Sequence, residues 1–196
     1  MSGPLYPGRI AALATLGPLT LLVTPLRQVL ESSMTMQMLV QLPLLFGIGA
    51  LFSQAVPSWM RMRLTPWNQF GITGLVLANI AIAVWMLPRA LDASVTEPLV
   101  TTAKYLSLPL LAGLPFALSW PLMNFIVRGV FLLELIATFF RLGWLYLISP
   151  ERLCNLYLLD DQQRLGLYML VIGTVLLLGV AGKLLWGNFG KTTSTL

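Results

Sequence analysis

The sequence predicts an all-α integral membrane protein, a single domain over residues 1–196 built as a bundle of about six transmembrane helices. Hydrophobic residues make up 57% of the chain, charged residues only 10%, and the mean hydropathy is +0.83. A soluble domain carries about 25% charged residues. The chain therefore has too little charge to cover a surface that faces water, and its apolar residues come in runs long enough to cross a bilayer.

Six apolar segments have the length and composition of spanning helices. They are residues 10–26, 34–56, 69–87, 99–119, 125–148 and 165–186. The first is the shortest, and a cleaved signal peptide is the alternative for it. We expect a retained helix, because only Arg9 marks a basic leader and no A-x-A-like cleavage site precedes Glu31.

Prolines and small residues inside the segments predict how the helices pack. A proline lacks the N–H group and frees a carbonyl, so we expect kinked helices packed against one another. These prolines are Pro18, Pro25, Pro43, Pro109 and Pro115. Small residues let two helices approach closely. The candidate pairs are Gly74 with Ala78 and Gly179 with Gly182.

The charged residues outside the segments predict the topology. One side receives six basic residues and no acid: Arg9, Arg61, Arg63, Arg128, Lys183 and Lys191. The other side receives the acids Glu31, Asp92, Glu97, Glu151, Asp160 and Asp161 and the four basic residues Arg27, Arg89, Arg152 and Arg164. Because Lys and Arg decide orientation, both termini are predicted to be cytoplasmic, in a bacterial inner membrane. The net charge of +5 comes from these scattered residues and does not indicate nucleic acid.

Missing residue types exclude most catalytic and metal sites. The chain has no histidine and one cysteine, Cys154. This composition excludes an internal disulfide, histidine-held haem or zinc, and a Ser-His-Asp triad. No phosphate-binding glycine loop is present. The sequence therefore predicts a protein that is not an enzyme and has no bound cofactor, copper being the alternative considered next.

Three methionines raise the alternative of a Cu(I) site. Met34 and Met38 are four residues apart and share a helix face, whereas Met36 lies on nearly the opposite side. Two thioethers suit Cu(I), and a third ligand would come from another helix, with Met169 or Cys154 as candidates. Methionine is also a common apolar filler, so packing is the alternative.

Three charged residues fall within or near the hydrocarbon and are functional candidates. Glu134 lies about nine residues into its segment. Arg141 follows seven residues later on the same helix face, about 10 Å along the axis. These two are expected to form an ion pair or to contact a partner. Lys104 opens the segment 99–119 and is expected to extend its ammonium to the interface.

The polar stretch "CNLYLLDDQQRLG", residues 154–166, precedes the last segment. Asp160 or Asp161 is expected to cap the helix that follows, because a carboxylate favours a helix N-terminus. Asp160, Asp161 and Gln162 are also candidates for contact with a partner protein.

Three stretches resemble the CtaG-type family of membrane cytochrome c oxidase assembly factors. They are "VTPLRQVLESSMTMQMLVQLPLL", "KYLSLPLLAGLPFALSWPL" and "DQQRLGLYM". The first is similar to a family helix that carries H-M-x-x-H-M. In the register chosen here, Ser33 and Gln37 replace the two histidines, and Lys104 falls near another family histidine. The resemblance implies a multi-helix inner-membrane fold and association with a respiratory complex. The missing histidines argue against carrying over the family's role in copper supply.

The combined expectation is a non-catalytic multi-pass membrane protein. It would act as an assembly factor or accessory structural subunit of a membrane redox or respiratory complex, in contact with lipid and with other membrane subunits. Two alternatives remain. One is a Cu(I)-handling protein that uses methionine thioethers. The other is a small transporter or channel with Glu134 as its polar element, which is disfavoured because no inverted repeats are evident.

Overall fold

The computed structural model describes residues 24–154 and 156–186, and these residues contain helices and connecting turns but no strand. The α-helices are α2 (Thr24–Leu30), α3 (Met34–Met36), α4 (Leu42–Ala55), α5 (Ser58–Leu64), α6 (Ile72–Trp85), α7 (Pro88–Thr96), α8 (Pro98–Ser107), α9 (Leu114–Ser119), α10 (Phe125–Ile148) and α11 (Leu159–Trp186). Two π-helical segments, Gln37–Gln41 and Leu108–Gly113, and two 3-10 turns, Gln69–Gly71 and Trp120–Leu122, connect some of them. The all-helical fold class is confirmed for this part of the chain.

The π-helical segments join short helices into two long continuous ones. In the first, the N–H of Leu42 donates to the carbonyl of Gln37. In the second, the N–H of Leu114 donates to the carbonyl of Pro109. Both bonds reach back five residues instead of four, which widens the turn. A proline lies inside the second segment and another follows the first by two positions, so the missing proline N–H groups coincide with the widened turns.

Within residues 24–154 and 156–186, fewer helices have the length and composition of a span than the six that the sequence predicts. Three helices are long and apolar enough to cross a membrane: Met34–Ala55, Pro98–Leu122 and Leu159–Trp186. A fourth is reached only if Ser58–Leu64 and Gln69–Trp85, which meet at an angle of 79°, count as one broken span. These helices and the apolar composition indicate a multi-pass membrane protein.

The remaining predicted spans account for the difference. Segment 10–26 lies outside the described residues except for its last three. Segment 69–87 was predicted as one span, but α6 has only 14 residues. The chain turns immediately before α6, where Phe70 and Gly71 both have positive φ angles, 61° and 71°. Segment 125–148 forms α10 with the predicted bounds, yet α10 carries three charged residues and is not among the helices counted above.

Stretches predicted as loops contain additional helix, and one of them, between segments 34–56 and 69–87, holds α5 (Ser58–Leu64). Residues 88–98 form α7 and the start of α8, and α11 begins at Leu159, six residues before the predicted segment 165–186. Proline stands at the start of both α7 and α8, where a helix needs no proline N–H. The chain therefore turns between its long helices through short helices.

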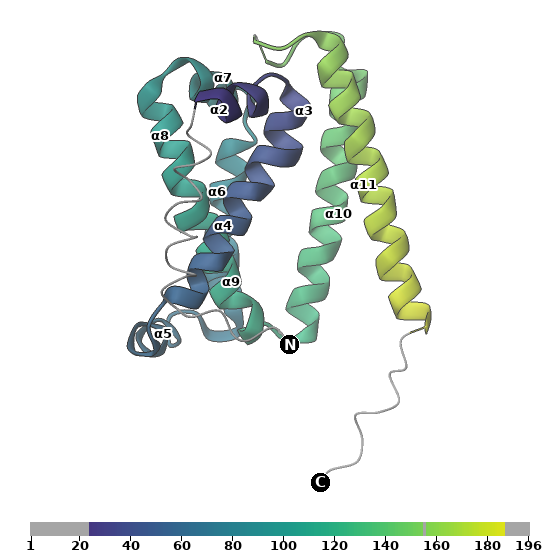
Figure 1. Cartoon of the computed structure of the whole chain (residues 1–196). Coiled ribbons are helices and arrows are strands. Elements are labelled where there is room, and N and C mark those ends of the chain that lie inside the picture. Colours follow the sequence, from purple (N-terminus) through teal and green to yellow (C-terminus); the bar gives the residue numbers. More distant parts are fainter. Residues whose placement is uncertain (1–23, 155, 187–196) are drawn as a thin grey trace, which may run out of the picture.

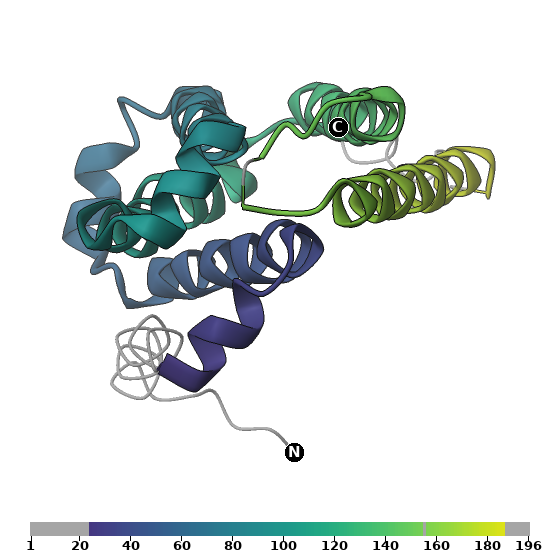
Figure 2. The same ribbon diagram turned by 90° about the horizontal axis from the view of Figure 1, so that it is seen from above.

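The helices form two groups that stand side by side (Figures 1 and 2). In one group α4 packs against α9 and the segment Leu108–Gly113, α6 packs against α9, and α7 packs against α8. In the other group α10 and α11 run along each other. α3 contacts α11 and links the groups. Buried apolar residues that include Leu45, Leu108, Tyr146 and Leu165 form one continuous core cluster across them.

The predicted glycine contacts hold at only one of the two places. A Cβ atom added at Gly74 would lie 2.1 Å from Ser119 Oγ, so α6 and α9 approach closely there, as predicted. At Gly179 and Gly182 nothing lies within 4 Å of such an atom. The described part of the chain therefore shows no close helix approach at these two glycines.

Charge separates along the bundle as the sequence predicts. The end that carries α2, α7 and the turn before α11 holds six acidic residues: Glu31, Asp92, Glu97, Glu151, Asp160 and Asp161. We call it the acidic end. The opposite end, with α5, the start of α10 and the end of α11, holds Arg61, Arg63, Arg128 and Lys183, and we call it the basic end (Figure 1).

Candidate functional site

A buried lysine lies at the centre of a polar cluster near the acidic end. Lys104, on α8, is 1% exposed. Its Nζ donates to Glu31 Oε1 at 3.1 Å, to Gln41 Oε1 at 3.1 Å and to Ser94 Oγ at 3.0 Å. An ammonium has three N–H donors, so three acceptors satisfy all of them. We call Glu31, Gln37, Gln41, Ser94 and Lys104 the Lys104 cluster.

Glu31 supplies the negative charge of this cluster. Its carboxylate pairs with Lys104 through Oε1 and accepts from Arg27 Nε at 2.8 Å through Oε2. It also accepts from Gln41 Nε2 at 3.4 Å. The side chains of Glu31 and Lys104 are only 6% and 1% exposed, whereas that of Arg27 is 29% exposed. The Lys104 pair is therefore the one most shielded from solvent.

Two glutamines extend the cluster toward other helices. Gln37 and Gln41 are both fully buried and lie four residues apart in the π-helical segment. Gln37 donates to Ser94 Oγ at 3.1 Å and accepts from the Tyr157 hydroxyl at 2.8 Å. Gln41 donates to the Tyr105 hydroxyl at 2.7 Å. The cluster thus ties the helix Met34–Ala55 to α7, to α8 and to the turn before α11.

The cluster corrects the expectation for Lys104 and adds residues that the sequence does not identify. Lys104 was predicted to extend its ammonium to the interface. The ammonium instead points into the protein, where three acceptors satisfy its N–H donors. Sequence patterns do not single out Gln41, Ser94 or Tyr157. The only signal for Gln41 is its place four residues after Gln37, on the same side of a helix.

The side chains of the Lys104 cluster are buried and hydrogen-bond to one another. Neither described cavity is lined by its members. Within residues 24–154 and 156–186, no three His, Cys, Asp or Glu side chains are placed to hold a metal. A charged network whose donors are satisfied by side chains of several helices joins those helices and fixes their relative position. We therefore infer that the Lys104 cluster holds these helices in fixed relative positions, and we call this role the structural lock.

Asp161 caps a helix other than the one expected. The sequence suggests that Asp160 or Asp161 caps α11, and both lie in its first turn. The Asp161 carboxylate accepts from the backbone N–H of Met34 and from Thr35 Oγ1, both at the start of α3. Ser33 caps the same helix by accepting from the N–H of Met36 at 3.1 Å. α11 thereby holds the N-terminus of the helix Met34–Ala55.

We predict that Asp161→Ala lowers the free energy of unfolding by about 1–2 kcal/mol, the usual cost of losing a helix cap. Thermal or denaturant unfolding in a mild detergent measures the change. Asp160→Ala is the matched control, because Asp160 is exposed and no contact to α3 involves it; it should change stability by less than about 0.5 kcal/mol. Equal effects of the two substitutions would show that the carboxylate of Asp161 does not cap α3.

Gln162 and Cys154 are both buried inside the protein. Gln162 is 2% exposed; its Oε1 accepts from the N–H of Leu153 at 2.9 Å, and its Nε2 donates to the carbonyl of Tyr146 at 3.3 Å. It therefore fastens the turn after α10 to α11. Cys154 is a free, buried cysteine, and burial raises its pKa to about 12. The thiol is protonated near neutral pH, which disfavours a role in metal transfer.

The three methionines of the copper hypothesis are all buried. Met34, Met38 and Met169 are 0%, 3% and 1% exposed and belong to the core cluster. The Tyr146 hydroxyl lies 3.8 Å from the Met38 sulfur, a long contact of the kind made by a weak thioether acceptor. Their packing accounts for them as apolar filler. Cu(I) binding by these residues stays a prediction.

Glu134 and Arg141 form the ion pair that the spacing suggests. Arg141 Nη2 contacts Glu134 Oε1 on α10. Both side chains are 63% exposed, so the pair lies on the outer surface of the described bundle instead of inside it. The neighbouring residues Val130, Leu133 and Trp144 are 63%, 65% and 61% exposed. The outer face of α10 is thus an apolar surface with one charge pair in it.

Comparisons with known proteins add no assignment to these sites. No family model, curated protein or solved structure matches the chain. The resemblance to the CtaG-type family consequently stays a prediction, and the function is inferred from the arrangement of the residues described above.

Proposed function

We propose that this protein is a non-catalytic multi-pass membrane protein that serves as an assembly factor or accessory subunit of a membrane redox or respiratory complex. The observation that carries the proposal is the Glu134–Arg141 pair on the outer face of α10. Charged groups inside a membrane are costly and mark functional positions. On this outer face the partner that shields them is another protein.

If α10 crosses the bilayer, as we propose, the Glu134–Arg141 pair lies within the hydrocarbon. Glu134 lies nine residues after Phe125, or about 13 Å along the helix axis, and Arg141 lies seven residues before Ile148, or about 10 Å. At these distances from the ends of α10, the charged groups of both residues reach bulk water only with difficulty. A helix with such a face fits the surface of a larger complex better than it fits lipid.

The interior of the protein supports a non-catalytic role. The Lys104 cluster is closed, its lysine is saturated, and Glu31 balances its charge. A transport path would need polar groups in sequence along an opening. In the described residues, Glu134 faces outward and is not part of such a path.

We propose a relation to the CtaG-type family in a register four residues on from the one in which Ser33 and Gln37 replace the two histidines. The family helix has two histidines four residues apart. Gln37 and Gln41 have that spacing, and both lie beside Lys104. In this register, glutamines and an ammonium occupy the places of three histidines. These groups hold no copper through imidazole, so we propose a relative in which internal hydrogen bonds replace a metal site.

We further propose a six-span topology with both termini in the cytoplasm of a bacterial cell. The separation of charge between the two ends supports this orientation, since the basic end carries Lys and Arg without acids. α10 would then cross the bilayer beside α11, although α10 carries the charged residues Arg128, Glu134 and Arg141. Segment 10–26 would supply the first span.

Substitution of the charge pair tests the partner function. In the double variant Glu134→Arg/Arg141→Glu the ion pair and the net charge are kept, but the direction of the pair is reversed. We expect the variant to fold with unchanged thermal stability in detergent. We expect its co-purification with the haem-containing oxidase subunits of native membranes to fall at least tenfold, because one reversed charge pair costs more than about 1.4 kcal/mol at a desolvated interface.

The matched control is Leu178→Ala/Leu185→Ala on α11, where two exposed side chains are also seven residues apart. It should leave co-purification unchanged. The proposal is wrong if the wild-type protein is extracted as a lone 21.6 kDa chain and deletion of its gene leaves membrane oxidase activity unchanged.

A further inference from the structure

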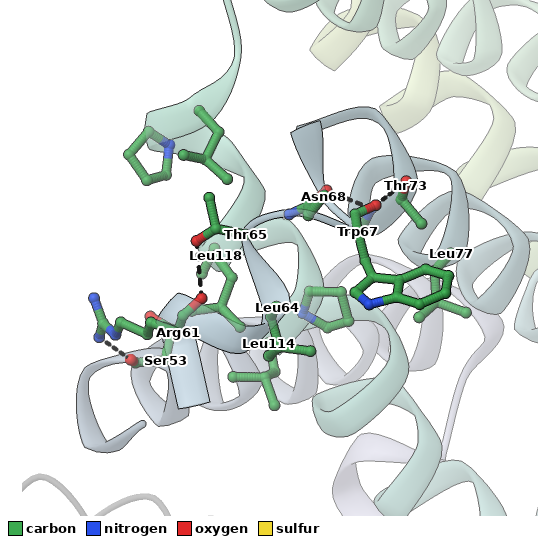
Figure 3. A pocket seen from close by; sticks show the side chains of 15 residues that line it. Ser53, Arg61, Leu64, Thr65, Trp67, Asn68, Thr73, Leu77, Leu114 and Leu118 are labelled. Carbon is green, nitrogen blue, oxygen red and sulfur yellow. Dashed lines mark hydrogen bonds between the residues drawn. The ribbon is translucent and has the colours of Figure 1, made fainter. Parts of the chain in front are cut away.

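A hollow of about 420 Å³ lies at the basic end, on the opposite side of the molecule from the Lys104 cluster. It is bounded by α5, α6, α9 and the end of α4. Figure 3 shows Arg61 and Ser53 at one end of the hollow, Trp67 and Leu77 at the other, and Leu64 and Leu114 between them. Its volume is within the range of about 300–1,000 Å³ that is usual for ligand sites.

Most of the lining of this hollow is hydrocarbon. Five leucines and two prolines line it: Leu64, Leu77, Leu114, Leu118, Leu122, Pro115 and Pro121. Several of its polar groups already have partners in the protein. Thr65 Oγ1 donates to the carbonyl of Arg61 at 2.8 Å, and Thr73 Oγ1 donates to the carbonyl of Trp67 at 2.7 Å. The surface left for a ligand is therefore apolar along most of its length.

Of the two arginines of α5, Arg63 lies on nearly the opposite side of the helix from Arg61, and only Arg61 lines this hollow. Arg61 lines it and donates from Nε and Nη2 to the carbonyls of Val56 and Ser53, which fixes the guanidinium against the end of α4. Arg63 lies over the Trp59 ring, 5.6 Å from its centroid. Among the described ion pairs none includes either arginine. All seven acidic residues of the chain lie elsewhere.

The surroundings of the hollow have the features of a membrane surface. The segment Gln69–Trp85 and α5 meet at 79°, so α5 turns away from the direction of the spans. Trp59 and Trp67 are 55% and 81% exposed. Exposed tryptophans next to arginines are typical of the boundary between hydrocarbon and headgroups.

We propose that this hollow binds an anionic phospholipid. One acyl chain lies along the leucine-lined surface, the phosphate lies against Arg61, and Arg63 adds positive charge on the other side of α5. Basic pockets between membrane helices take anionic headgroups because each Lys or Arg near the surface attracts the negative charge. A second protein helix is a poorer occupant, since the hollow is short and carries an unpaired positive charge at its end. The proposal is independent of the partner function.

Lipid retention by the full-length protein tests this proposal. The protein is reconstituted in nanodiscs of phosphatidylcholine and phosphatidylglycerol in equal amounts and extracted into mild detergent. The retained lipids are then counted by mass spectrometry. We expect wild type to retain phosphatidylglycerol over phosphatidylcholine. The variant Arg61→Gln/Arg63→Gln should lose this preference by about tenfold to thirtyfold, given the usual attraction per arginine.

Three further variants separate the charge, the hollow and the fold. Arg61→Lys/Arg63→Lys keeps the charge and should keep most of the preference. Ala117→Phe places a ring in the hollow and should lower retention while leaving both arginines in place. Arg89→Gln/Arg152→Gln removes two exposed charges at the acidic end and should retain the wild-type preference.

The proposal is overturned by any of three results. The first is equal retention of the two lipids by wild type. The second is an equal loss in Arg61→Gln/Arg63→Gln and in Arg89→Gln/Arg152→Gln, which would show an effect of net charge alone. The third is wild-type retention in Ala117→Phe, which would show that the hollow holds no acyl chain.

Discussion

Glu31→Ala is expected to lower the free energy of unfolding by about 3–5 kcal/mol, the usual cost of removing one partner from a buried ion pair. Lys104 would then be a buried cation with only the neutral oxygens of Gln41 and Ser94 as partners. The side chain of Lys104 is only 1% exposed in the native arrangement. The substitution therefore leaves a charge without compensation.

Lys104→Met is expected to lower the free energy of unfolding by less than Glu31→Ala does. When Lys104 is removed, Glu31 still pairs with Arg27, which is 29% exposed and accessible to water. Gln41 also still donates to its carboxylate. The remaining charge is thus partly compensated, and methionine fills most of the volume that lysine occupied.

A double-mutant cycle measures the coupling directly. Unfolding in detergent is compared for Glu31→Gln, Lys104→Met and the variant with both substitutions. The double variant should be less destabilised than the sum of the single variants, with a coupling energy of about 1–3 kcal/mol. Additive effects, or a larger loss for Lys104→Met than for Glu31→Ala, would contradict the structural lock.

The long helices could be predicted from the sequence because their signal is local. A run of about 20 apolar residues has few alternatives in a bilayer, so the helices Met34–Ala55 and Pro98–Leu122 lie close to their predicted ranges. The expected ion pair of Glu134 with Arg141 also follows from local spacing, since seven residues bring two side chains to one helix face.

The Lys104 cluster could not be predicted because its members come together only through the tertiary fold. Lys104 is 73 positions from Glu31 and 63 from Gln41 along the chain. A lysine near the end of an apolar segment has two solutions, extension to water or internal pairing. The choice depends on acceptors from other helices. Hydropathy shows where Lys104 lies along its helix but not where its side chain points.

The two ends of the bundle use polar groups differently. At the acidic end, buried side chains satisfy one another and join α7, α8 and the helix Met34–Ala55. At the basic end, Arg61 and Arg63 have no acidic partner in the described structure, and Arg61 lines an apolar hollow. Rigidity is consequently expected at the acidic end, and binding at the basic end.

The helices Met34–Ala55 and Pro98–Leu122 are in close contact at Gly49 and Gly113, so a larger residue at these positions should be strongly destabilising. A Cβ atom added at Gly49 would lie 2.2 Å from the carbonyl oxygen of Pro109, and one added at Gly113 would lie 2.1 Å from that of Phe46. Both obstacles are backbone atoms, which move only if the helices separate. Gly113→Ala should therefore lower the free energy of unfolding by about 3 kcal/mol, the upper part of the range for overpacked sites.

Gly47→Ala is the matched control, because Gly47 lies in the same helix as Gly49 and nothing is within 4 Å of an added Cβ atom there. Alanine is the better helix former, so this variant should be unchanged or more stable by up to about 1 kcal/mol. Separation of the helices at Gly113 would also draw Lys104 away from Gln41. Gly113→Ala should therefore weaken the coupling measured between Glu31 and Lys104. Equal stabilities of Gly47→Ala and Gly113→Ala would show that the helices do not cross at these glycines.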